Sequence, residues 1–312
     1  MARGAAGPDA VDGLVVVDKP AGWTSHDVVG KLRKIYGLRR VGHAGTLDPD
    51  ATGVLLVGLG RATRLLRFLT DTGKLYRGEV AFGVATDTLD AAGVETARQP
   101  MPEATAADLE AVLPRFLGTI AQVPPMVSAI KVDGRRLHEL ARAGEVVERE
   151  PRTVRIDRIE IEVFAAGEYP RAQLLVECGS GTYIRSLAAD LGEALGGYAH
   201  LAWLRRLRVG PFPVEEAHTL EAIAETPEKV LLPLVEAVRH LPRVDVDGET
   251  ARGVGHGAVF PATALGQDLV GDDAGPFAVV GSDGALLALY QKGRAAARPV
   301  VVLKSADSGS GS

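Results

Sequence analysis

The apolar and polar positions of the chain are arranged in a way that predicts buried strands with amphipathic helices between them. Continuous apolar, β-branched runs are typical of buried strands, and apolar residues three and four positions apart are typical of helices. Strands are expected at 14–17, 54–57, 75–84, 154–164 and 174–178. Helices are expected at 28–35, 61–69, 105–117, 184–195 and 215–240. Their mixed order indicates an α+β fold with one large mixed sheet rather than a regular βαβ array.

The first of these helices is framed by residues that commonly begin and end helices. Thr24, Ser25 and Asp27 are N-cap candidates, because their side-chain oxygens can accept hydrogen bonds from the first turn. Gly37 is expected to end the helix in a left-handed conformation. His26 lies between Ser25 and Asp27, but adjacent residues on one helical turn cannot line up as a catalytic triad. This run is therefore expected to be a cap.

The character of the chain changes after Pro242. Residues 243–304 are rich in Val, Gly and Asp, which indicates a small separate β domain. Its strands are expected at 278–280, 285–290 and 300–303. The main domain is expected to cover 13–240. Residues 1–12 are expected to form a disordered arm and the Gly/Ser-rich residues 305–312 a flexible tail.

Composition excludes several classes of protein. The chain has 312 residues, of which 46% are hydrophobic and 24% charged, so it is not a wholly disordered chain, a collagen-like repeat or a coiled coil. Cys178 is the only cysteine, which excludes an intramolecular disulfide and a Cys-rich zinc site. The sequence has no apolar signal peptide and no apolar run long enough to span a bilayer. A cytoplasmic protein without membrane contact is therefore expected.

Charge is distributed unevenly along the chain, although the formal net charge is only −5. Residues 31–77 hold ten Lys and Arg against three Asp and Glu, a local charge of +7. Residues 211–312 hold eight against fourteen, a local charge of −6. This asymmetry favours contact between one surface and a polyanion. Two solvated faces of opposite sign would leave the same pattern.

The densest chemical signal is the glycine-rich loop 42–53, Gly-His-Ala-Gly-Thr-Leu-Asp-Pro-Asp-Ala-Thr-Gly. Glycines allow backbone conformations and close approaches that other side chains block. Pro49 biases Asp48 toward an extended backbone. One carboxylate would then be held out from a stiff turn. The alternative is an ordinary Asp-Pro turn in which the aspartate only caps the turn.

Three further segments allow a functional and a structural interpretation. Arg185 follows the N-cap candidate Thr182 in the first turn of a helix, where the helix dipole disfavours a cation, so it indicates an anionic partner or is simply exposed. The basic run 201–208 is either a strand with one RNA-facing side or a solvated edge strand. Residues 74–77, Lys-Leu-Tyr-Arg, suit stacking on a base beside phosphates, but an amphipathic surface strand has the same pattern.

Two other enzyme classes are disfavoured. Residues 58–63, Gly-Leu-Gly-Arg-Ala-Thr, follow a strand as a dinucleotide-binding fingerprint does. However, Thr63 replaces the third glycine and the strand order is not βαβ, so a tight turn is favoured. The seven histidines show no paired spacing that would clamp a metal ion. No metal is expected.

Taken together, several segments resemble one known family, the bacterial tRNA pseudouridine synthases of the TruB type. They occur in the same order as in that family, and the resemblance covers about residues 13–210. The segments are 13–20 (Gly-Leu-Val-Val-Val-Asp-Lys-Pro), 24–25 (Thr-Ser), 42–53, 74–76 (Lys-Leu-Tyr), 181–185 (Gly-Thr-Tyr-Ile-Arg) and 204–207 (Leu-Arg-Arg-Leu).

The resemblance implies a fold, a reaction and a partner. The fold would be a pseudouridine synthase catalytic domain with a large mixed β-sheet, followed by a small C-terminal PUA-like β domain. The reaction would be the isomerisation of uridine 55 in the T-loop of tRNA to pseudouridine, by base flipping and without a cofactor. The partner would be the T-arm stem-loop of tRNA, with no protein partner required, and the enzyme would act as a monomer.

The resemblance also implies the roles of individual residues. The family's nucleophilic aspartate falls on Asp48, its base-stacking tyrosine on Tyr76 and the arginine that pairs with the aspartate on Arg185. The other matched positions are a histidine that enters the T-loop, two pocket-lining residues and a lysine that supports the catalytic loop. They fall on His43, Tyr183, Leu204 and Lys19.

Two departures from the family pattern lead to further expectations. Asp50 stands where the family often has an apolar residue, and it is expected to face solvent, because an inward carboxylate would raise the pKa of Asp48. The acidic segment 243–304 is similar to the family's RNA-binding end domain only in size and β character. The alternative function is a tRNA-folding chaperone that uses the same surface but does not need Asp48, and both roles can coexist in one protein.

Overall fold

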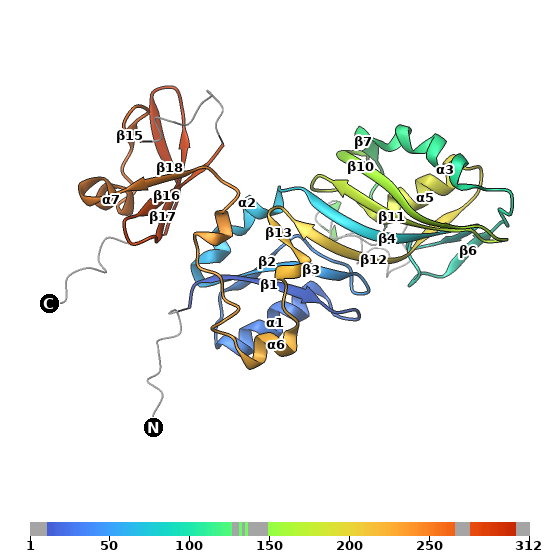
Figure 1. Ribbon diagram of the computed structural model, residues 1–312, viewed down its shortest axis with the longest axis horizontal. Helices are drawn as coiled ribbons and strands as arrows, with labels where there is room; N and C mark the ends of the chain where they lie inside the picture. Colours follow the sequence, from blue (N-terminus) through green and yellow to red (C-terminus); the bar gives the residue numbers. More distant parts are fainter. Residues whose placement is uncertain (1–10, 127–130, 133–134, 137–148, 266–274, 304–312) are drawn as a thin grey trace.

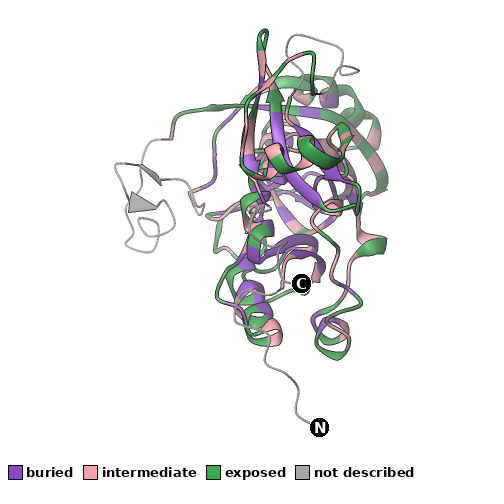
Figure 2. Ribbon diagram, turned by 90° about the vertical axis from the view of Figure 1, so that its left-hand side faces the viewer, coloured by how far each residue is buried: buried purple, intermediate pink, exposed green. Residues whose placement is uncertain are grey.

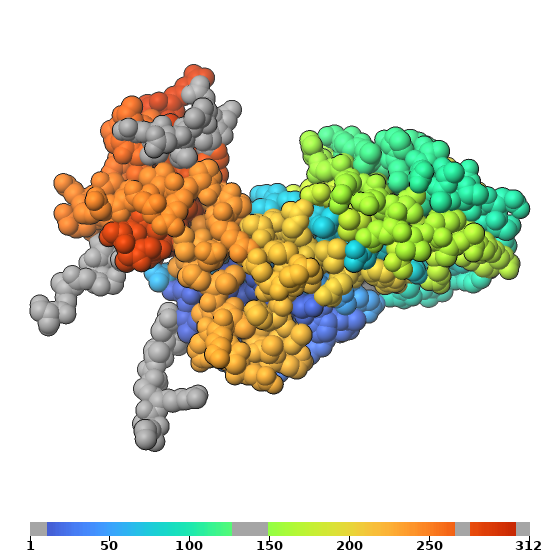
Figure 3. Space-filling model, viewed as in Figure 1, coloured from blue at the N-terminus to red at the C-terminus, as the bar shows by residue number. Residues whose placement is uncertain are grey.

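The computed structural model describes residues 11–126, 131–132, 135–136, 149–265 and 275–303. It contains a nine-stranded main sheet and a separate five-stranded C-terminal sheet (Figure 1). In the space-filling view the C-terminal sheet, coloured orange to red, forms one end of the molecule, and the green middle segment of the chain forms the other (Figure 3). The expected α+β fold with a large mixed sheet and a small C-terminal β part is confirmed.

The main sheet is mixed, with the strand order β1-β3-β12-β4-β11-β10-β7; β2 pairs with β3, and β13 with β12. Its strands are β1 (Gly13–Lys19), β2 (Val41–Ala44), β3 (Thr52–Leu59), β4 (Lys74–Phe82), β7 (Gly118–Gln122), β10 (Arg152–Ala165), β11 (Arg171–Cys178), β12 (Ala199–Val209) and β13 (Phe212–Pro213). The shorter strands β5 (Val84–Thr86) with β6 (Glu95–Arg98), and β8 (Lys131–Val132) with β9 (Arg135–Arg136), form two small sheets. Strand β12 joins the two halves of the main sheet, because it pairs with β3 on one side and β4 on the other.

The first helix, α1 (Ser25–Tyr36), begins and ends as predicted. Thr24 is its N-cap and forms a capping box with Asp27, and Gly37 ends it at a φ of 65°. The other helices are α2 (Leu66–Thr70), α3 (Ala106–Val112), α5 (Ile184–Ala194), α6 (Leu220–Glu225) and α7 (Gly248–Gly255). Short 3-10 turns are η1 (Gly60–Arg64), η2 (Leu113–Phe116), η3 (Val214–Glu216) and η4 (Glu236–Val238). No described helix is both long enough and apolar enough to cross a membrane.

The main sheet is covered by helices in both of its halves. In strands β1 and β3 alternate residues face opposite sides, so that Val15 and Leu55 belong to the cluster under α1 and α6, while Leu14 and Leu56 belong to the cluster that includes α2 and η4. This burial on both faces explains their continuous apolar runs. Strands β4, β11 and β12 pack against α3 and α5. Buried residues accordingly follow the strands of the sheet (Figure 2).

The C-terminal sheet has the order β14-β16-β17-β18-β15. Its strands are β14 (Arg243–Val246), β15 (Phe260–Pro261), β16 (Phe277–Gly281), β17 (Leu286–Lys292) and β18 (Ala296–Val302). One side has its own apolar cluster with α7, and Val280 and Leu289 on the other side join the cluster around α2. Arg61, Arg64 and Arg67 donate hydrogen bonds to backbone carbonyls of residues 300–303. Three cations of the basic segment 31–77 therefore connect the C-terminal sheet to the main one.

The helix expected over 215–240 is wrong. Within that range the chain forms only α6 and the single turns η3 and η4. Pro227 and Pro233 lack backbone donors and interrupt a helix. The segment pairs with β1 instead, since Leu14 and Leu232 exchange backbone hydrogen bonds at 2.8 and 2.9 Å. Tertiary pairing overrides the local apolar periodicity here.

The turn after β3 is not arranged as a dinucleotide site. Strands β1 and β3 are antiparallel, and the turn that follows is the 3-10 turn η1 rather than an α-helix. The backbone N–H of Arg61 donates to the carboxylate of Asp12, which also accepts from the Arg61 guanidinium at 2.7 Å. A carboxylate of this chain thus occupies the place a phosphate would need. Asp12 belongs to the expected disordered arm; residues 1–10 and the expected tail 305–312 lie outside the described residues.

Candidate active site

Lys19 binds the backbone of the loop that carries Asp48. This lysine is fully buried, and its Nζ donates to the carbonyls of Pro20, Trp23 and Pro49 at 2.8, 2.7 and 2.8 Å. Burial lowers the pKa of Lys19 to about 8, and nearby carboxylates oppose this shift. Because Pro49 directly follows Asp48, Lys19 lies where the resemblance placed a loop-supporting lysine.

Ser25 anchors the same loop from α1. Its hydroxyl donates to the carbonyl of Leu47 at 3.1 Å and accepts from the backbone N–H of Leu47 at 3.0 Å. The sequence indicated Ser25 only as a cap candidate. Thr24 makes the cap, which leaves Ser25 free to fix the residue before Asp48.

Arg206 of β12 is the third residue that fixes the backbone of the loop. It is fully buried, and its guanidinium donates to the carbonyls of Val54, Thr46 and Gly45 at 2.7, 3.4 and 3.1 Å. Gly53 allows the close approach of the two backbones, because a Cβ at its φ of +99° would lie 2.2 Å from the Arg206 carbonyl oxygen. The loop is therefore stiff, as the glycine and proline pattern predicted.

The interpretation of the basic run 201–208 as a solvated edge strand is wrong. The run lies in β12, which is a central strand between β3 and β4 and not an edge strand. Arg205 pairs with Asp18 at 2.7 Å and Arg208 with Glu177 at 2.5 Å. Arg206 is buried, so all three cations of the run make contacts within the protein.

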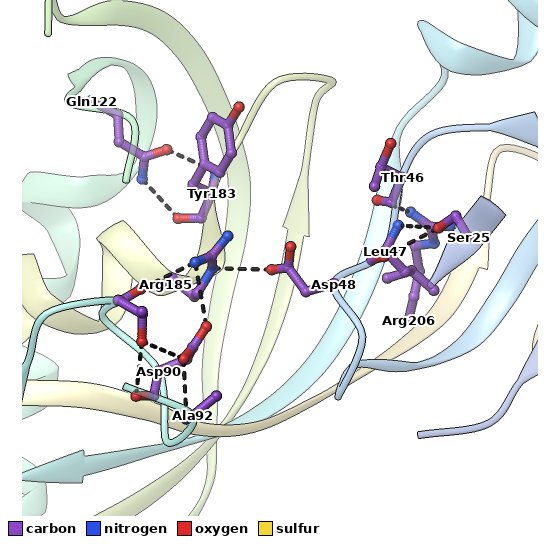
Figure 4. Close-up of polar contacts among 11 residues, drawn as sticks. Ser25, Thr46, Leu47, Asp48, Asp90, Ala92, Gln122, Tyr183, Arg185 and Arg206 are labelled. Carbon is purple, nitrogen blue, oxygen red and sulfur yellow. Dashed lines mark hydrogen bonds and ion pairs between the residues drawn. The ribbon is translucent and has the colours of Figure 1, made fainter. Parts of the chain in front are cut away.

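Asp48 and Arg185 meet at the centre of this arrangement (Figure 4). Asp48 Oδ2 lies 3.0 Å from Arg185 Nε, and Asp90 Oδ2 lies 3.3 Å from another guanidinium nitrogen of Arg185. The Arg185 side chain is only 5% exposed, whereas that of Asp48 is 44% exposed. The anionic partner indicated for a cation in the first turn of α5 is thus a pair of carboxylates.

The charge of Asp48 depends on this pairing. Burial raises the pKa of Asp48 above its ordinary value, the Arg185 guanidinium opposes the rise, and the Asp90 carboxylate adds to it. Asp50 is exposed, as expected. The arginine is therefore the main group that favours an ionised carboxylate at Asp48.

The start of α5, and with it Arg185, is positioned by Gln122 at the end of β7. The backbone N–H of Tyr183 donates to Gln122 Oε1 at 2.8 Å, and Gln122 Nε2 donates to the Tyr183 carbonyl at 3.1 Å (Figure 4). Tyr183, not Thr182, is the N-cap residue. The expectation for Thr182 is wrong because its hydroxyl donates to the carbonyl of Gly179, which is part of the preceding turn.

A cavity of about 250 Å³ opens beside the ion pair, lined in part by Tyr76, Tyr183 and Leu204. The Tyr76 side chain comes from β4 and is 7% exposed. Burial raises the pKa of its phenol, so Tyr76 is neutral at ordinary pH. The structure thus gathers five of the predicted site residues, these three with Asp48 and Arg185, around one cavity.

Two of the predicted site residues, Lys19 and His43, do not line this cavity. His43 lies on β2, and its ring is nearly perpendicular to that of His26, with the two ring centroids 5.5 Å apart. Burial lowers the pKa of His43 to about 4, with His26 adding to the effect, so the ring is neutral. Its Nδ1 is buried and has no hydrogen-bond partner within the described part of the chain.

Four residues that shape the site were not predicted, namely Ser25 as a loop anchor, Asp90, Gln122 and Arg206. Their contacts join positions between 22 and 161 residues apart in sequence, so spacing along the chain does not predict these contacts. Among the residues that the structure describes, no group of three or more His, Cys, Asp or Glu is placed to hold a metal ion.

Comparison with known proteins assigns the chain to a family. The TruB family pseudouridylate synthase N-terminal domain matches residues 33–184, and the tRNA pseudouridylate synthase B C-terminal domain matches residues 185–239. The tRNA pseudouridine synthase B of Thermobifida fusca is 45% identical over 297 residues, which cover 93% of this chain and 98% of that protein. The tRNA pseudouridine synthase B of Symbiobacterium thermophilum is 50% identical over 252 residues, 81% of this chain and 84% of that protein.

Solved structures agree with this assignment. A chain of an H/ACA RNP bound to a substrate RNA containing 2′-deoxyuridine is 27% identical, with a TM-score of 0.71, and the match covers 95% of this chain and 86% of that one. A chain of a Cbf5-Nop10-Gar1 complex is 29% identical, with a TM-score of 0.72 and the same coverage. The chain therefore belongs to the TruB family of pseudouridylate synthases, enzymes that isomerise uridine.

Proposed function

We propose that this chain, acting as a monomer in the cytoplasm, converts uridine 55 in the T-loop of tRNA to pseudouridine, with Asp48 as the nucleophile and without a cofactor. The observation that carries the proposal is the Asp48 carboxylate, paired with Arg185 at 3.0 Å on the wall of a cavity lined by Tyr76 and Leu204. The relatives named tRNA pseudouridine synthase B support tRNA as the substrate.

The reaction is an isomerisation, so its atoms and electrons balance within the substrate. The N1–C1′ bond breaks, the uracil rotates, and a C5–C1′ bond forms; the proton lost from C5 balances the proton gained at N1. An ionised carboxylate can act by attacking C1′, by attacking C6 or by removing the C2′ proton. All three routes need Asp48 charged and directed into the cavity, which is the arrangement that Arg185 supports.

The other residues of the cavity hold the freed base. The neutral phenol of Tyr76 provides a flat apolar surface against which uracil can stack. Leu204 and Tyr183 line the same cavity and exclude water, so that the base is not lost before C5 is joined.

The target base must leave the folded T-loop to reach Asp48, which costs roughly a few kcal/mol. Phosphate contacts can offset this cost. Of the cations in the basic segment, four are exposed and make no side-chain hydrogen bond or ion pair within the described residues. They are Lys31, Lys34, Arg39 and Arg40 on and after α1. His43, whose Nδ1 has no partner in the described chain, follows them on β2, and we place the T-arm on this face.

The test is to incubate the full chain with a T-arm stem-loop and to map pseudouridine by carbodiimide modification and primer extension. The expected result is one new stop, at the position of uridine 55. No stop, or a stop at another uridine, contradicts the proposed substrate. A tRNA-folding role uses the same RNA-binding surface but not Asp48, so a variant that folds tRNA without converting it separates the two activities.

A further inference from the structure

A second cavity, of about 410 Å³, shares a wall with the first. Asp48, Arg185 and Leu204 line both cavities. The rest of its lining comes from the residues after Asp48, from the turn between β5 and β6, and from β12. A polymeric substrate whose reacting unit enters the first cavity therefore meets a second cavity directly beside that unit.

The floor of the second cavity is a gap in the strand pairing along β12. Strand β3 pairs with β12 at Arg205, and the segment after β5 pairs with it at Leu201, whose N–H donates to the Leu89 carbonyl at 3.0 Å and whose carbonyl accepts from Ala91 at 3.0 Å. Between these two points lies Trp203, with no described strand beside it on that edge.

A β-bulge turns the Trp203 side chain away from the face that Leu201 occupies, and Trp203 is one of the residues that line the second cavity. The pairing of β12 with β4 shifts register between Leu201 and Trp203, and such a bulge redirects the side chains that follow it. Leu201 stays in the core at 4% exposure, whereas Trp203, two residues further on, is 38% exposed. In a regular strand both side chains would face the same side.

The opposite wall is a tightly held turn. Leu89 has a φ of 63° and is the only non-glycine residue with a positive φ in the described chain, a strained conformation of the kind that clusters at functional sites. Next to it, Asp90 pairs with Arg185 at 3.3 Å and accepts from the hydroxyl of Thr88 at 2.6 Å. The cavity is therefore bounded by positions that the fold fixes.

The residues that line the second cavity indicate which chemical class of ligand it can bind. Asp48, Asp50 and Asp90 contribute three carboxylates against the single cation Arg185, so a phosphate group would be repelled. Apart from Thr88, the remaining lining residues are Trp203 and apolar residues such as Ala91 and Leu204. A neutral, flat heterocycle that stacks on the indole fits both properties.

We propose that this cavity takes the nucleobase directly next to the target uridine, stacked on Trp203, and that Trp203 is thereby a specificity-determining residue. The inference rests on the proposed function, because it requires an RNA whose target uridine occupies the first cavity. The flanking base then leaves the loop together with the target, and its stacking offsets part of the cost of extruding both.

The test uses T-arm stem-loops that carry an abasic residue directly 5′ or directly 3′ of the target, compared with the intact RNA. With the native chain, one of the two abasic RNAs is expected to lower kcat/KM roughly tenfold, the size of one base–aromatic stack. Trp203→Ala is expected to show a similar loss on intact RNA and no further loss on that abasic RNA. Trp203→Phe, which keeps an aromatic ring, is expected to recover most of the activity and the sensitivity.

Tyr198→Ala is the matched control, because Tyr198 is 41% exposed and lines neither cavity. This variant is expected to behave as the native chain does with every RNA. The inference is overturned if Trp203→Ala stays as sensitive to the abasic residue as the native chain, or if the native chain converts both abasic RNAs as fast as intact RNA. Failure of the native chain to convert intact T-arm RNA overturns the proposed function itself and the inference with it.

Discussion

Replacement of Arg185 by methionine tests how the site keeps Asp48 charged. The methionine has a similar length and no charge, so it suits a side-chain position that is only 5% exposed. Burial and Asp90 raise the pKa of Asp48, and without Arg185 nothing of comparable size opposes them. Because the carboxylate must be ionised to act, activity will be lost at a higher pH on acidification than in the native chain.

The size of this effect follows from the ion pair. Two unit charges about 4 Å apart attract each other by roughly 4 kcal/mol at an effective dielectric constant of about 20. The Asp48 side chain is 44% exposed, so solvent screens the pair and a value of about 1.5 kcal/mol is more realistic. Since about 1.4 kcal/mol corresponds to one pH unit, the acidic limb of the pH profile is expected to move up by about one unit.

The assay is kcat/KM for conversion of a T-arm stem-loop as a function of pH, with thermal melting to show that each variant is folded. Arg185→Lys is the control, because it keeps the charge but loses the planar guanidinium that contacts two carboxylates. Its turnover is expected to fall more than its RNA affinity, with a smaller movement of the acidic limb. An acidic limb that stays in place in folded Arg185→Met refutes the electrostatic role assigned to this arginine.

Two further predictions concern the loop that carries Asp48. Gly53→Ala places a Cβ 2.2 Å from the Arg206 carbonyl oxygen at a φ of +99°, so the free energy of unfolding should fall by roughly 3 kcal/mol in urea denaturation; an unchanged midpoint contradicts the close approach. Burial lowers the pKa of Lys19 to about 8. Above that pH the lysine loses a proton that it donates to the loop, so kcat should decline. The Lys19→Met variant should have a low kcat at every pH and show no such decline. The pKa of Lys19 in the folded chain lies below its ordinary value of 10.5, so the stability of the fold is expected to rise between about pH 8 and 10.5 while kcat declines. A melting temperature that falls together with kcat contradicts the assignment of the decline to Lys19.

The local features of the fold could be predicted from the sequence because short-range physics determines them. The capping box at Thr24 and Asp27, the stop at Gly37 and the stiff turn at Asp48 each depend on residues a few positions apart. The buried strands followed from apolar runs, since β1 and β3 are covered on both faces.

The remaining features depend on contacts between distant parts of the chain. Arg206 looked like one of several cations on a basic strand, and only the fold shows that it is buried under the loop 160 residues earlier. Arg61 and Arg64 counted toward a basic RNA-binding surface, but they donate to the C-terminal sheet. The segment 215–240 has helical periodicity and yet pairs with β1. The pairing of Asp48 with Arg185 was implied by a resemblance between sequences and could not be worked out from spacing.

The central claim, that an ionised Asp48 carries out the isomerisation, is tested most directly by Asp48→Asn. The amide has almost the same shape but cannot act as the nucleophile. Pseudouridine formation in a T-arm stem-loop is expected to fall at least roughly a thousand-fold, about 4 kcal/mol, while the affinity for the RNA changes little. Turnover within tenfold of the native chain, with affinity retained, would contradict the account.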